Sequence, residues 1–464
     1  CKKNDIFFAI KGSLIDGTKY IKSAINQGAR TIVYDENFEG LKDGVLYIKS
    51  RNVRKTLSKI SYKFYKHKPK NLIAVTGTNG KSSIADFYFQ ILELNKKKVA
   101  SIGTLGIKTL HQRIPVLNTT LDPINLAYHL SRLKKKKIEN VILEASSHGI
   151  KQHRLDGLEF SIGIFTNLSH DHLDYHKNFS DYLNSKLYLF KELLKKKSNI
   201  ITDKEIKEYK KIQDISLKKK IGLSLISNDK TGLSIVSHQY EGEKQMLRIR
   251  YKKKYYNICV NLIGKIQIKN IFMSIIAAEK SGLDITKIIN IIHKLKPVEG
   301  RLEKIGNIRN RSCVILDYAH TPEALKACII NIKDQFKNKK VHIVFGCGGD
   351  RDKFKRTKMG KIVNKYCDKI YLTDDNPRSE NPKKIRNEIK KEISKIKLKE
   401  IASREKAIKT GVMDLLTGDI LIVAGKGHEN IQEYKGVKKV FSDRKIILQT
   451  IKKKKCLFIK RYKN

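Results

Sequence analysis

The sequence is poor in residues that mark several classes of protein: its 464 residues include no tryptophan, 7 prolines and 7 cysteines. No two cysteines form a CxxC pair, and scattered thiols in odd number are typical of a reducing compartment. No apolar run approaches the roughly 20 residues that a membrane-spanning helix needs, and no secretory signal is visible. These absences exclude a disulfide-stapled secreted domain and predict a cytoplasmic protein without membrane insertion.

Acidic residues are also scarce, with 46 Asp and Glu against 97 Lys and Arg, which gives a formal net charge of +51. Such a charge can indicate nucleic-acid binding, which steeply salt-dependent binding to DNA or RNA would reveal. However, aromatic residues do not alternate with the basic runs as a base-stacking surface requires. We expect the lysine runs 134–137 and 452–455 at helix ends or tails. The charge therefore predicts an anionic substrate and no nucleic-acid partner.

Because proline is so rare, composition marks no linker, and the domain boundaries are predicted from pattern. The chain length favours about three domains, which we expect at residues 1–67, 68–296 and 297–464. Strand and helix patterns alternate, which predicts an α/β fold of parallel sheets with helices on both faces. The chain begins at Cys1 and the strand-like DIFFAI follows almost at once, so we expect a truncated N-terminal domain.

The strongest single motif is VTGTNGKSS at residues 75–83, between a predicted strand and a predicted helix. Gly77 and Gly80 allow backbone N–H groups to turn towards a phosphate. Lys81 supplies a cation, Ser82 or Ser83 a hydroxyl for Mg²⁺, and the helix N-terminus a favourable dipole. Val75 replaces the first glycine of the usual spacing. The motif predicts a central ATP-binding domain of the P-loop type, the alternative being a glycine-rich turn without a ligand.

Two further motifs follow predicted strands of the central domain. Glu144 ends the strand VILE, and a carboxylate beside a phosphate loop is a reasonable Mg²⁺ ligand. The segment TNLSHDHLDYH contains His170, His172 and His176. These histidines suggest zinc, but no cysteine is near and the spacing matches no standard zinc pattern. The alternative for His170 and His176 is a solvent-exposed loop.

Four strand-then-loop units follow residue 297: CVILDYAHTP, VHIVFGCGGDRD, KIYLTDDNPR and ILIVAGKGHE. In open parallel sheets ligands gather at the carboxyl ends of strands, so we expect these loops to converge. Arg378 stands between a proline and a serine. Because proline restricts the local backbone, we interpret Arg378 as a positioned guanidinium that can bind a carboxylate or phosphate through two hydrogen bonds. The alternative is that DNPR is only a capped turn.

Taken together, these motifs resemble the Mur ligases of peptidoglycan synthesis. GTNGKSS, LEASSHGIKQHRLDG, TNLSHDHLDYH, SKLYLF, GRLE, LDYAHTP, GCGGDRD, DNPR and GKGHE occur in the order seen in that family. More narrowly, the chain resembles the members of the family that add meso-diaminopimelate to UDP-N-acetylmuramoyl-L-alanyl-D-glutamate. It implies an N-terminal UDP-substrate domain, a central ATPase domain and a C-terminal Rossmann-like amino-acid domain. D-alanyl-D-alanine-adding ligases and folylpolyglutamate synthetases are the alternatives, and an assay of amino-acid acceptors separates them.

The reaction that the resemblance implies is ATP-dependent amide formation through an acyl phosphate, with ATP and Mg²⁺ required. It implies these catalytic residues: Lys81, Glu144, His172 and Lys186. Carbamylation would make Lys186 an anion (N6-carboxylysine), the alternative being an ordinary surface lysine.

The metal ligands implied are Ser82, Glu144, His172 and the Lys186 carbamate. The ATP-binding residues implied are Gly77, Thr78, Asn79, Gly80, Lys81, Ser82, Ser83, Asn270, Arg301 and Asp317. The sequence departs from the family's G-x-F-N-x-x-N pattern at Ile266 and Gln267.

The resemblance also implies two sites for small-molecule substrates. The UDP-substrate residues implied are Ser13, Leu14, Ile15, Asn118, Thr119, Thr120, Ser146, Gln152 and Arg154. The diaminopimelate residues implied are Arg351, Asp375, Asn376, Pro377, Arg378, Gly425 and Glu429. In the family, DNPR marks the diaminopimelate-adding members, and an unpaired arginine would penalise lysine. A D-S-R segment that the family has just before the position of Cys1 is absent here. We expect a monomer.

Overall fold

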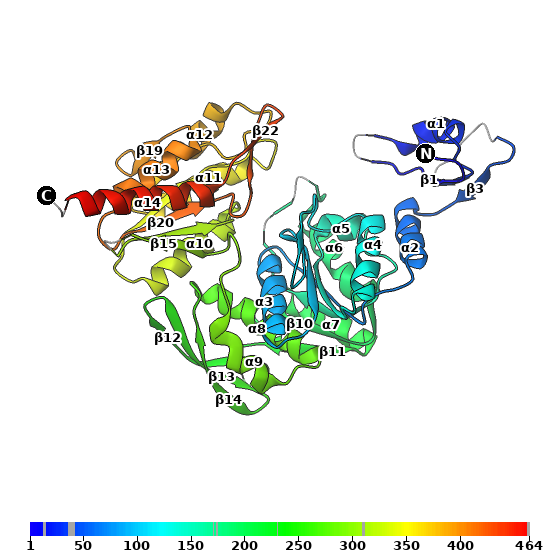
Figure 1. Ribbon diagram of the computed structural model, residues 1–464, viewed down its shortest axis with the longest axis horizontal. Helices are drawn as coiled ribbons and strands as arrows, with labels where there is room; N and C mark the ends of the chain where they lie inside the picture. The colour runs from blue at the N-terminus through cyan, green and yellow to red at the C-terminus, as the bar shows by residue number, and fades with distance from the viewer. Residues whose placement is uncertain are drawn as a thin grey trace.

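A computed structural model describes residues 1–12, 15–35, 42–169, 171–172, 175–229, 231–308 and 311–461, with the backbone alone at 457–461. Three lobes follow one another along the chain, and the two termini lie at opposite ends of the molecule (Figure 1). The predicted three-domain α/β class is therefore confirmed. The predicted boundaries at 67 and 296 stay predictions. No helix in the described part of the chain combines the length and the apolar character that crossing a membrane requires.

The N-terminal domain is built on a small parallel sheet in the order β1–β2–β3. Its elements are β1 (Ile6–Phe8), η1 (Gly17–Tyr20), α1 (Ile21–Asn26), β2 (Thr31–Tyr34), β3 (Leu46–Lys49) and α2 (Val53–Phe64). Asn52 begins α2 by accepting the backbone N–H of Lys55 at 2.9 Å. Tyr62 of α2 donates to the carbonyl of Arg154 at 2.8 Å. The helix therefore attaches the first lobe to the second.

The central domain contains an eight-stranded sheet in the order β11–β10–β9–β4–β8–β5–β6–β7, whose pairings are parallel except those that β6 makes with β5 and β7. Its strands are β4 (Asn71–Thr76), β5 (Val99–Gly103), β6 (Gly106–Lys108), β7 (Arg113–Ile114), β8 (Asn140–Glu144), β9 (Phe160–Phe165), β10 (Leu194–Asp203) and β11 (Gly222–Ile226). Its helices are α3 (Lys81–Leu94), α4 (Pro123–Lys135), α5 (Ser147–Lys151), α6 (Phe179–Glu192), α7 (Tyr209–Lys219), α8 (Lys265–Lys280), α9 (Ile285–Ile291) and η2 (Ile292–Lys294).

Both faces of this sheet are buried, which explains its continuous apolar strands. Ile73 and Val75 of β4 pack against α3 and α8, whereas Leu72 and Ala74 point to the core with α4, α6 and α7. This alternation follows from the two-residue period of a strand. A second, antiparallel sheet extends the core on the α8 side. Its strands are β12 (Ser234–Glu241), β13 (Lys244–Tyr251) and β14 (Lys254–Val260).

The C-terminal domain has a six-stranded sheet in the order β15–β16–β20–β17–β18–β19, in which only β15 is antiparallel. Its strands, with the hairpin β21–β22, are β15 (Glu303–Asn307), β16 (Cys313–Asp317), β17 (Val341–Phe345), β18 (Lys369–Leu372), β19 (Leu398–Glu400), β20 (Ile420–Ala424), β21 (Ile431–Tyr434) and β22 (Val437–Val440). Its helices are α10 (Pro322–Gln335), α11 (Phe354–Tyr366), α12 (Pro382–Lys390), α13 (Arg404–Asp414) and α14 (Asp443–Arg461).

The four predicted strand-then-loop units are strands β16, β17, β18 and β20, which are parallel and central in this sheet. Helices α10, α11 and α12 cover one face, and α13 and α14 cover the other. Because the four strands run in one direction, their carboxyl ends meet at one edge. The loops that follow them therefore converge, as the sequence predicts.

One expectation about the lysine runs is wrong. The run 452–455 lies inside α14 and not at a helix end or in a tail. Lys454 is buried, and its Nζ donates to the carbonyls of Val412, Met413 and Leu415 at 2.9, 3.0 and 2.7 Å. These are carbonyls at the C-terminal end of α13, which lack partners within their own helix. A cation there also interacts favourably with the helix dipole, so this lysine is structural.

Candidate active site between the central and C-terminal domains

The phosphate loop connects β4 to α3 through two glycines in the left-handed region. Gly77 has φ +140° and Gly80 has φ +90°. A Cβ atom at Gly77 would lie 1.9 Å from Thr166 Oγ1, and one at Gly80 would lie 2.7 Å from Asn270 Oδ1. Thr166 Oγ1 in turn donates to the carbonyl of Asn79 at 2.6 Å. The segment after β9 therefore holds the loop in one shape, which only glycine permits at these two positions.

Two lysines donate to a single backbone oxygen of this loop. Lys81 Nζ lies 2.9 Å from the carbonyl oxygen of Gly77 and 2.9 Å from that of Thr78. Lys186 Nζ, from α6, lies 2.8 Å from the same Gly77 oxygen. Burial lowers the pKa of Lys81 from its usual value. Two ammonium groups this close repel one another, so one of the two amines gains by losing its proton.

Of the two amines, that of Lys186 is the one that this arrangement favours in its unprotonated form. Its side chain is buried, so the alternative of an ordinary surface lysine is wrong. Its Nζ lies 4.4 Å from the ring centroid of Tyr182. Burial, and then the charge of Lys81, lower the pKa of Lys186 well below the usual value for lysine. A buried primary amine whose pKa is lowered in this way is a better nucleophile than an exposed lysine.

Ser82 and Glu144 form an oxygen pair at the other side of the loop. Ser82 Oγ donates to Glu144 Oε2 at 2.9 Å, and the carboxylate also accepts the backbone N–H of Thr104 at 2.9 Å. Glu144 is buried, and a Cβ at Gly103 would lie 2.2 Å from its Oε1. A hydroxyl and a carboxylate are ligands that Mg²⁺ prefers, so this donor set fits the ion.

His172 lies within electrostatic range of Lys81 and Lys186, since the charges of both, after burial, help to lower its pKa. Burial lowers the pKa of His172 to about 4, so the ring is neutral at pH 7. Its Nε2 is 3.4 Å from Asp171 Oδ2. Within the described ranges no three His, Cys, Asp or Glu side chains group as a metal site, and Mg²⁺ commonly takes its other ligands from water and phosphate. His170 lies outside the described residues, and His176 is buried, which corrects the expectation of an exposed loop.

A cavity of about 250 Å³ opens beside the phosphate loop, between the central and C-terminal domains. It brings together six of the ten predicted ATP-binding residues: Asn79, Gly80, Ser83, Asn270, Arg301 and Asp317. Gln267, where the sequence departs from the family pattern, also lines it. Gln267 accepts a hydrogen bond from Asn270 Nδ2 at 3.0 Å. The glutamine at position 267, although it differs from the family pattern, therefore holds the Asn270 side chain in place through this hydrogen bond.

Arg301 and Asp317 approach this cavity from the C-terminal side. The guanidinium of Arg301 lies 4.3 Å from the ring centroid of Tyr318, and its Nη2 donates to Ser82 Oγ at 3.5 Å. Asp317 accepts the backbone N–H groups of Leu302 and Ala319 at 2.7 and 2.8 Å. Burial raises the pKa of Asp317 above its usual value. The two side chains are thus held in place by the sheet edge that carries them.

A second cavity, of about 280 Å³, adjoins the first. Six of the seven predicted diaminopimelate residues line it: Arg351, Asp375, Asn376, Arg378, Gly425 and Glu429. Asp171 and His172 of the central domain complete it, and Tyr318 and His320 line both cavities. His320 Nδ1 donates to the carbonyl of Tyr318 at 3.0 Å, so Nε2 of the neutral ring is an acceptor. Tyr318 and His320 therefore form a wall that is common to both cavities.

Arg378 is held as the sequence suggests, although by other means than Pro377 alone. Its backbone is in the left-handed region, with φ +50°, which few non-glycine residues adopt. Its N–H donates to the carbonyl of Glu433 at 3.2 Å, and its Nη1 donates to that of Gly349 at 2.6 Å. The nearest acidic oxygen in an ion pair, Glu433 Oε2, is 4.0 Å from Nε. The guanidinium thus retains capacity for an anion.

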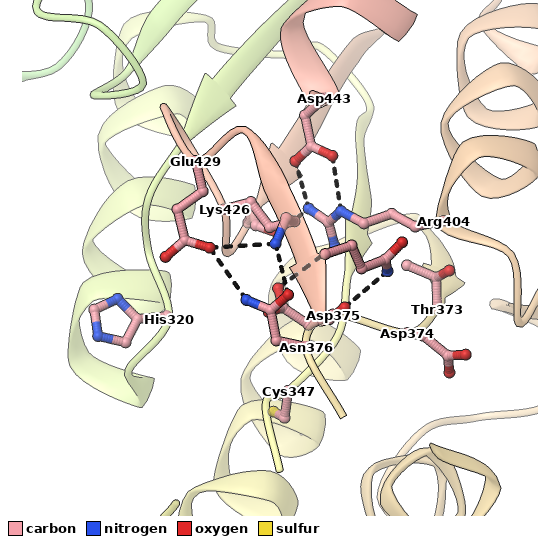
Figure 2. A network of polar contacts seen from close by, with 12 residues as sticks. His320, Cys347, Thr373, Asp374, Asp375, Asn376, Arg404, Lys426, Glu429 and Asp443 are labelled. Atoms are coloured by element: carbon pink, nitrogen blue, oxygen red, sulfur yellow. Dashed lines mark hydrogen bonds and ion pairs between the residues drawn. The ribbon is translucent and has the colours of Figure 1, made fainter. Parts of the chain in front are cut away.

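Two polar networks support this second cavity (Figure 2). Lys426 Nζ donates to Asn376 Oδ1 at 2.9 Å and to Glu429 Oε2 at 3.2 Å. Asn376 Nδ2 donates to the same Glu429 oxygen at 3.2 Å. Arg404 pairs with Asp443 through two hydrogen bonds, and its Nη1 lies 3.7 Å from Asp375 Oδ2. Gly425 is required here, since a Cβ would lie 2.7 Å from Asp375 Oδ2.

Sequence reasoning missed four of these residues. Lys426 stands inside the GKGHE motif and could have been singled out there. Tyr318 and His320 stand inside LDYAHTP in the same way. Arg404, however, carries no local signal, because its partner Asp443 is 39 residues away. Such long-range pairs depend on how α13 and α14 pack, which a local pattern does not contain.

The residues predicted to bind the UDP-substrate form a third cluster, with four exceptions. Thr120 Oγ1 donates to the carbonyl of Glu144 at 2.8 Å and lies 3.0 Å from Ser146 Oγ. Arg154 donates to the carbonyl of Thr120 and to Gln152 Oε1, at 2.5 and 2.7 Å. Thr119 Oγ1 lies 3.0 Å from Thr104 Oγ1. The exceptions are exposed Asn118, exposed Ile15 in the N-terminal domain, and Ser13 with Leu14, which lie outside the described residues.

Replacing Asp443 with alanine is expected to lower the free energy of unfolding by about 3 kcal/mol, because Arg404 becomes an unpaired buried cation. Both side chains are fully buried, and the guanidinium donates to the two carboxylate oxygens at 2.8 and 2.6 Å. Urea denaturation followed by circular dichroism measures the change. Asp214→Ala, which removes an exposed carboxylate of α7, is the control. Equal stabilities for the two variants would contradict this account of the pair.

Comparisons with known proteins agree with this geometry. Residues 1–65 match the family model of the Mur ligase family, catalytic domain; residues 75–278 match the Mur ligase middle domain; and residues 300–427 match the Mur ligase, glutamate ligase domain. A protein of Rickettsia montanensis named UDP-N-acetylmuramoyl-L-alanyl-D-glutamate--2,6-diaminopimelate ligase is 39% identical over 457 residues, which cover 97% of this chain and 94% of the relative. A protein of Chelativorans sp. (strain BNC1) with the same name is 37% identical over 450 residues, covering 97% and 92%.

Solved structures give the same result at the level of fold. A structure of a UDP-N-acetylmuramoyl-L-alanyl-D-glutamate--2,6-diaminopimelate ligase superposes with a TM-score of 0.71 and 29% identity, covering 98% of this chain and 93% of that one. The MurF ligase from Thermotoga maritima in complex with ADP has a TM-score of 0.66 at 18% identity, covering 98% and 95%, which supports the fold alone. The resemblance first noted in the motifs is therefore confirmed across all three domains, and the chain belongs to the Mur ligase family.

Proposed function

We propose that this chain is an ATP-dependent amide ligase that adds meso-diaminopimelate to UDP-N-acetylmuramoyl-L-alanyl-D-glutamate, forming ADP and phosphate. The observation that carries the proposal is the pair of adjoining cavities with a common wall of Tyr318 and His320. One cavity opens on a phosphate loop, and the other contains the arginines of GDRD and DNPR. Relatives that carry this activity in their names align over nearly the whole chain.

In the first step, an oxygen of the substrate carboxylate attacks the γ-phosphorus of ATP, the bond to the bridging oxygen breaks so that ADP leaves, and the carboxylate becomes an acyl phosphate. A carboxylate is a poor acyl donor until one of its oxygens becomes a good leaving group, and phosphorylation achieves this. Lys81 and the N-terminus of α3 neutralise charge on the transferring phosphoryl group. The Ser82 and Glu144 oxygens would hold Mg²⁺, which when bound neutralises phosphate charge. Asn270, Arg301 and Asp317 bind the nucleoside side.

We propose that Lys186 acts as a carbamate. Its neutral amine adds to the carbon of CO₂ and releases a proton, which converts a buried base into a carboxylate. That anion would relieve the repulsion with Lys81 and provide a ligand for a second Mg²⁺ together with His172. The shared Gly77 oxygen places the modified side chain against the phosphate loop. The low pKa of Lys186 supports this chemistry, because only the unprotonated amine reacts with CO₂.

In the second step, the amine of the amino acid displaces phosphate from the acyl phosphate. We propose that Arg378 and Arg351 bind the distal carboxylate of meso-diaminopimelate, and that Glu429 with Asn376 binds its distal ammonium. Asp375 and Gly425 shape the cavity, and Pro377 shapes the loop. The UDP-substrate contacts of Thr119, Thr120, Ser146, Gln152, Arg154, Asn118, Ser13, Leu14 and Ile15 stay a prediction. So do the monomeric state, the cytoplasmic location and the absence of a nucleic-acid partner.

The proposed activity is tested by phosphate release from ATP with Mg²⁺ and UDP-N-acetylmuramoyl-L-alanyl-D-glutamate. We expect release with meso-diaminopimelate and little with lysine, since a site built for a polar group rejects an analogue that lacks it. D-alanyl-D-alanine with the UDP-tripeptide, and glutamate with a folate, test the two related ligase activities. Turnover of lysine at the rate of diaminopimelate, or of neither, would contradict the proposal.

A further inference from the structure

Lys426 is a fully buried cation behind the amino-acid cavity that the mechanism above does not use. Its side chain is 0% exposed, and no charged part of it reaches the cavity surface. Its Nζ has two side-chain acceptors, Asn376 Oδ1 at 2.9 Å and Glu429 Oε2 at 3.2 Å. Asn376 Oδ1 also accepts the backbone N–H of Glu433 at 3.1 Å. These contacts fix which way the Asn376 amide points (Figure 2).

The fixed geometry leaves one oxygen of Glu429 for a ligand. Oε2 is occupied by Lys426 and by Asn376 Nδ2. Oε1 has the hydroxyl of Tyr318 at 3.4 Å, a long contact. An ammonium group entering the cavity would therefore be met by Oε1, and Lys426 decides that it is this oxygen.

The charges of the cavity are unevenly balanced, and Lys426 is a main cause. Glu429 has Lys426 as a direct counter-charge. Asp375 has Arg404 at 3.7 Å. Arg378 donates to a neutral carbonyl, and its nearest paired carboxylate oxygen is 4.0 Å away. Glu429 and Asp375 are thus compensated by buried cations, whereas Arg378 retains uncompensated charge, so this part of the cavity attracts a carboxylate more than a lone ammonium.

We propose that Lys426 is a specificity-determining positioning residue, which selects an amino acid with a distal ammonium and carboxylate over one with a distal ammonium alone. The inference rests on the proposed function. Without Lys426, Glu429 is an uncompensated acid that attracts the ammonium of lysine and repels the distal carboxylate of diaminopimelate. The interaction is strong because it acts at short range in a partly buried site.

The test is the ratio of kcat/KM for meso-diaminopimelate to kcat/KM for lysine. Lys426→Met is expected to lower this ratio about tenfold or more, the order expected for a close charge interaction in such a site, with KM for ATP unchanged. The double variant Lys426→Met, Glu429→Gln removes both charges and is expected to restore most of the ratio, although its turnover is lower. If circular dichroism finds Lys426→Met unfolded, Lys426→Gln carries the same expectation.

Lys454→Met is the matched control, because Lys454 is also a buried lysine of this domain but donates to three carbonyls at the C-terminal end of α13. It should lower stability and leave the ratio unchanged. An equal loss with both amino acids in Lys426→Met, or a double variant with the ratio of the single one, would overturn the inference and leave the proposed function standing. A wild-type chain that ligates neither amino acid would instead overturn the proposed function itself.

Discussion

Lys186→Ala is expected to lower the rate of phosphate release about 1,000-fold, the order seen when one preorganised group that stabilises transition-state charge is removed. The wild-type Lys186 Nζ lies 2.8 Å from the Gly77 oxygen that Lys81 also contacts. Alanine removes the amine that the carbamate needs, and Lys81 then has no anion opposite it. Steady-state phosphate release at saturating substrates measures the loss.

Small carboxylates separate a carbamate from a structural lysine. If the missing group is an anion, formate or acetate should restore part of the activity of Lys186→Ala, because either acid can enter the space that the side chain leaves. Lys191→Ala removes an exposed lysine of the same helix and should change little. Carbon-13 bicarbonate should also give a carbamate signal in the NMR spectrum of the wild type alone. No rescue at any concentration, together with no such signal, would refute the carbamate.

Arg378→Ala is expected to lower kcat/KM for meso-diaminopimelate by about 100- to 1,000-fold, as truncation of one partner of a buried charge pair does, with KM for ATP nearly unchanged. The guanidinium is about three-quarters buried, at 25% exposed, and its backbone contacts orient it. Without it, the distal carboxylate loses its main partner. Initial rates with each substrate varied in turn give both constants.

Arg378→Lys is a useful second variant, because a point charge cannot reproduce two parallel hydrogen bonds. It should recover only part of the activity. Arg248→Ala removes an exposed arginine from the antiparallel sheet of the central domain and controls for the loss of net charge. Similar increases in KM for ATP and for diaminopimelate would argue that Arg378 supports the fold and not the amino acid.

Lys186 and Lys454 differ in how much of their role a sequence motif could predict. The position of Lys186 in SKLYLF was enough to select it among the many lysines of this chain. Its burial and its shared acceptor with Lys81 were not predictable, because they depend on α6 packing beside the phosphate loop. For Lys454, the run of four lysines was expected at a helix end or in a tail, and this was wrong because the run lies inside α14, where Lys454 is buried.

In the amino-acid cavity, too, the sequence predicted only part of the roles of Arg378 and Lys426. The sequence predicted a positioned guanidinium from a neighbouring proline, yet contacts with residues 349 and 433 hold it. Lys426 lies between two predicted residues and was passed over, because a lysine in a basic chain carries little information until its burial is known.

The sequence by itself determined the α/β class, the phosphate loop and the converging strand-end motifs, because these depend on short-range periodicity, on glycine and on residues adjacent in the chain. Only the tertiary structure decided which charges neutralise one another, such as Lys426 with Glu429 and Arg404 with Asp443. The physical reason is that burial and counter-charge arise from segments far apart in sequence that packing brings within a few ångströms.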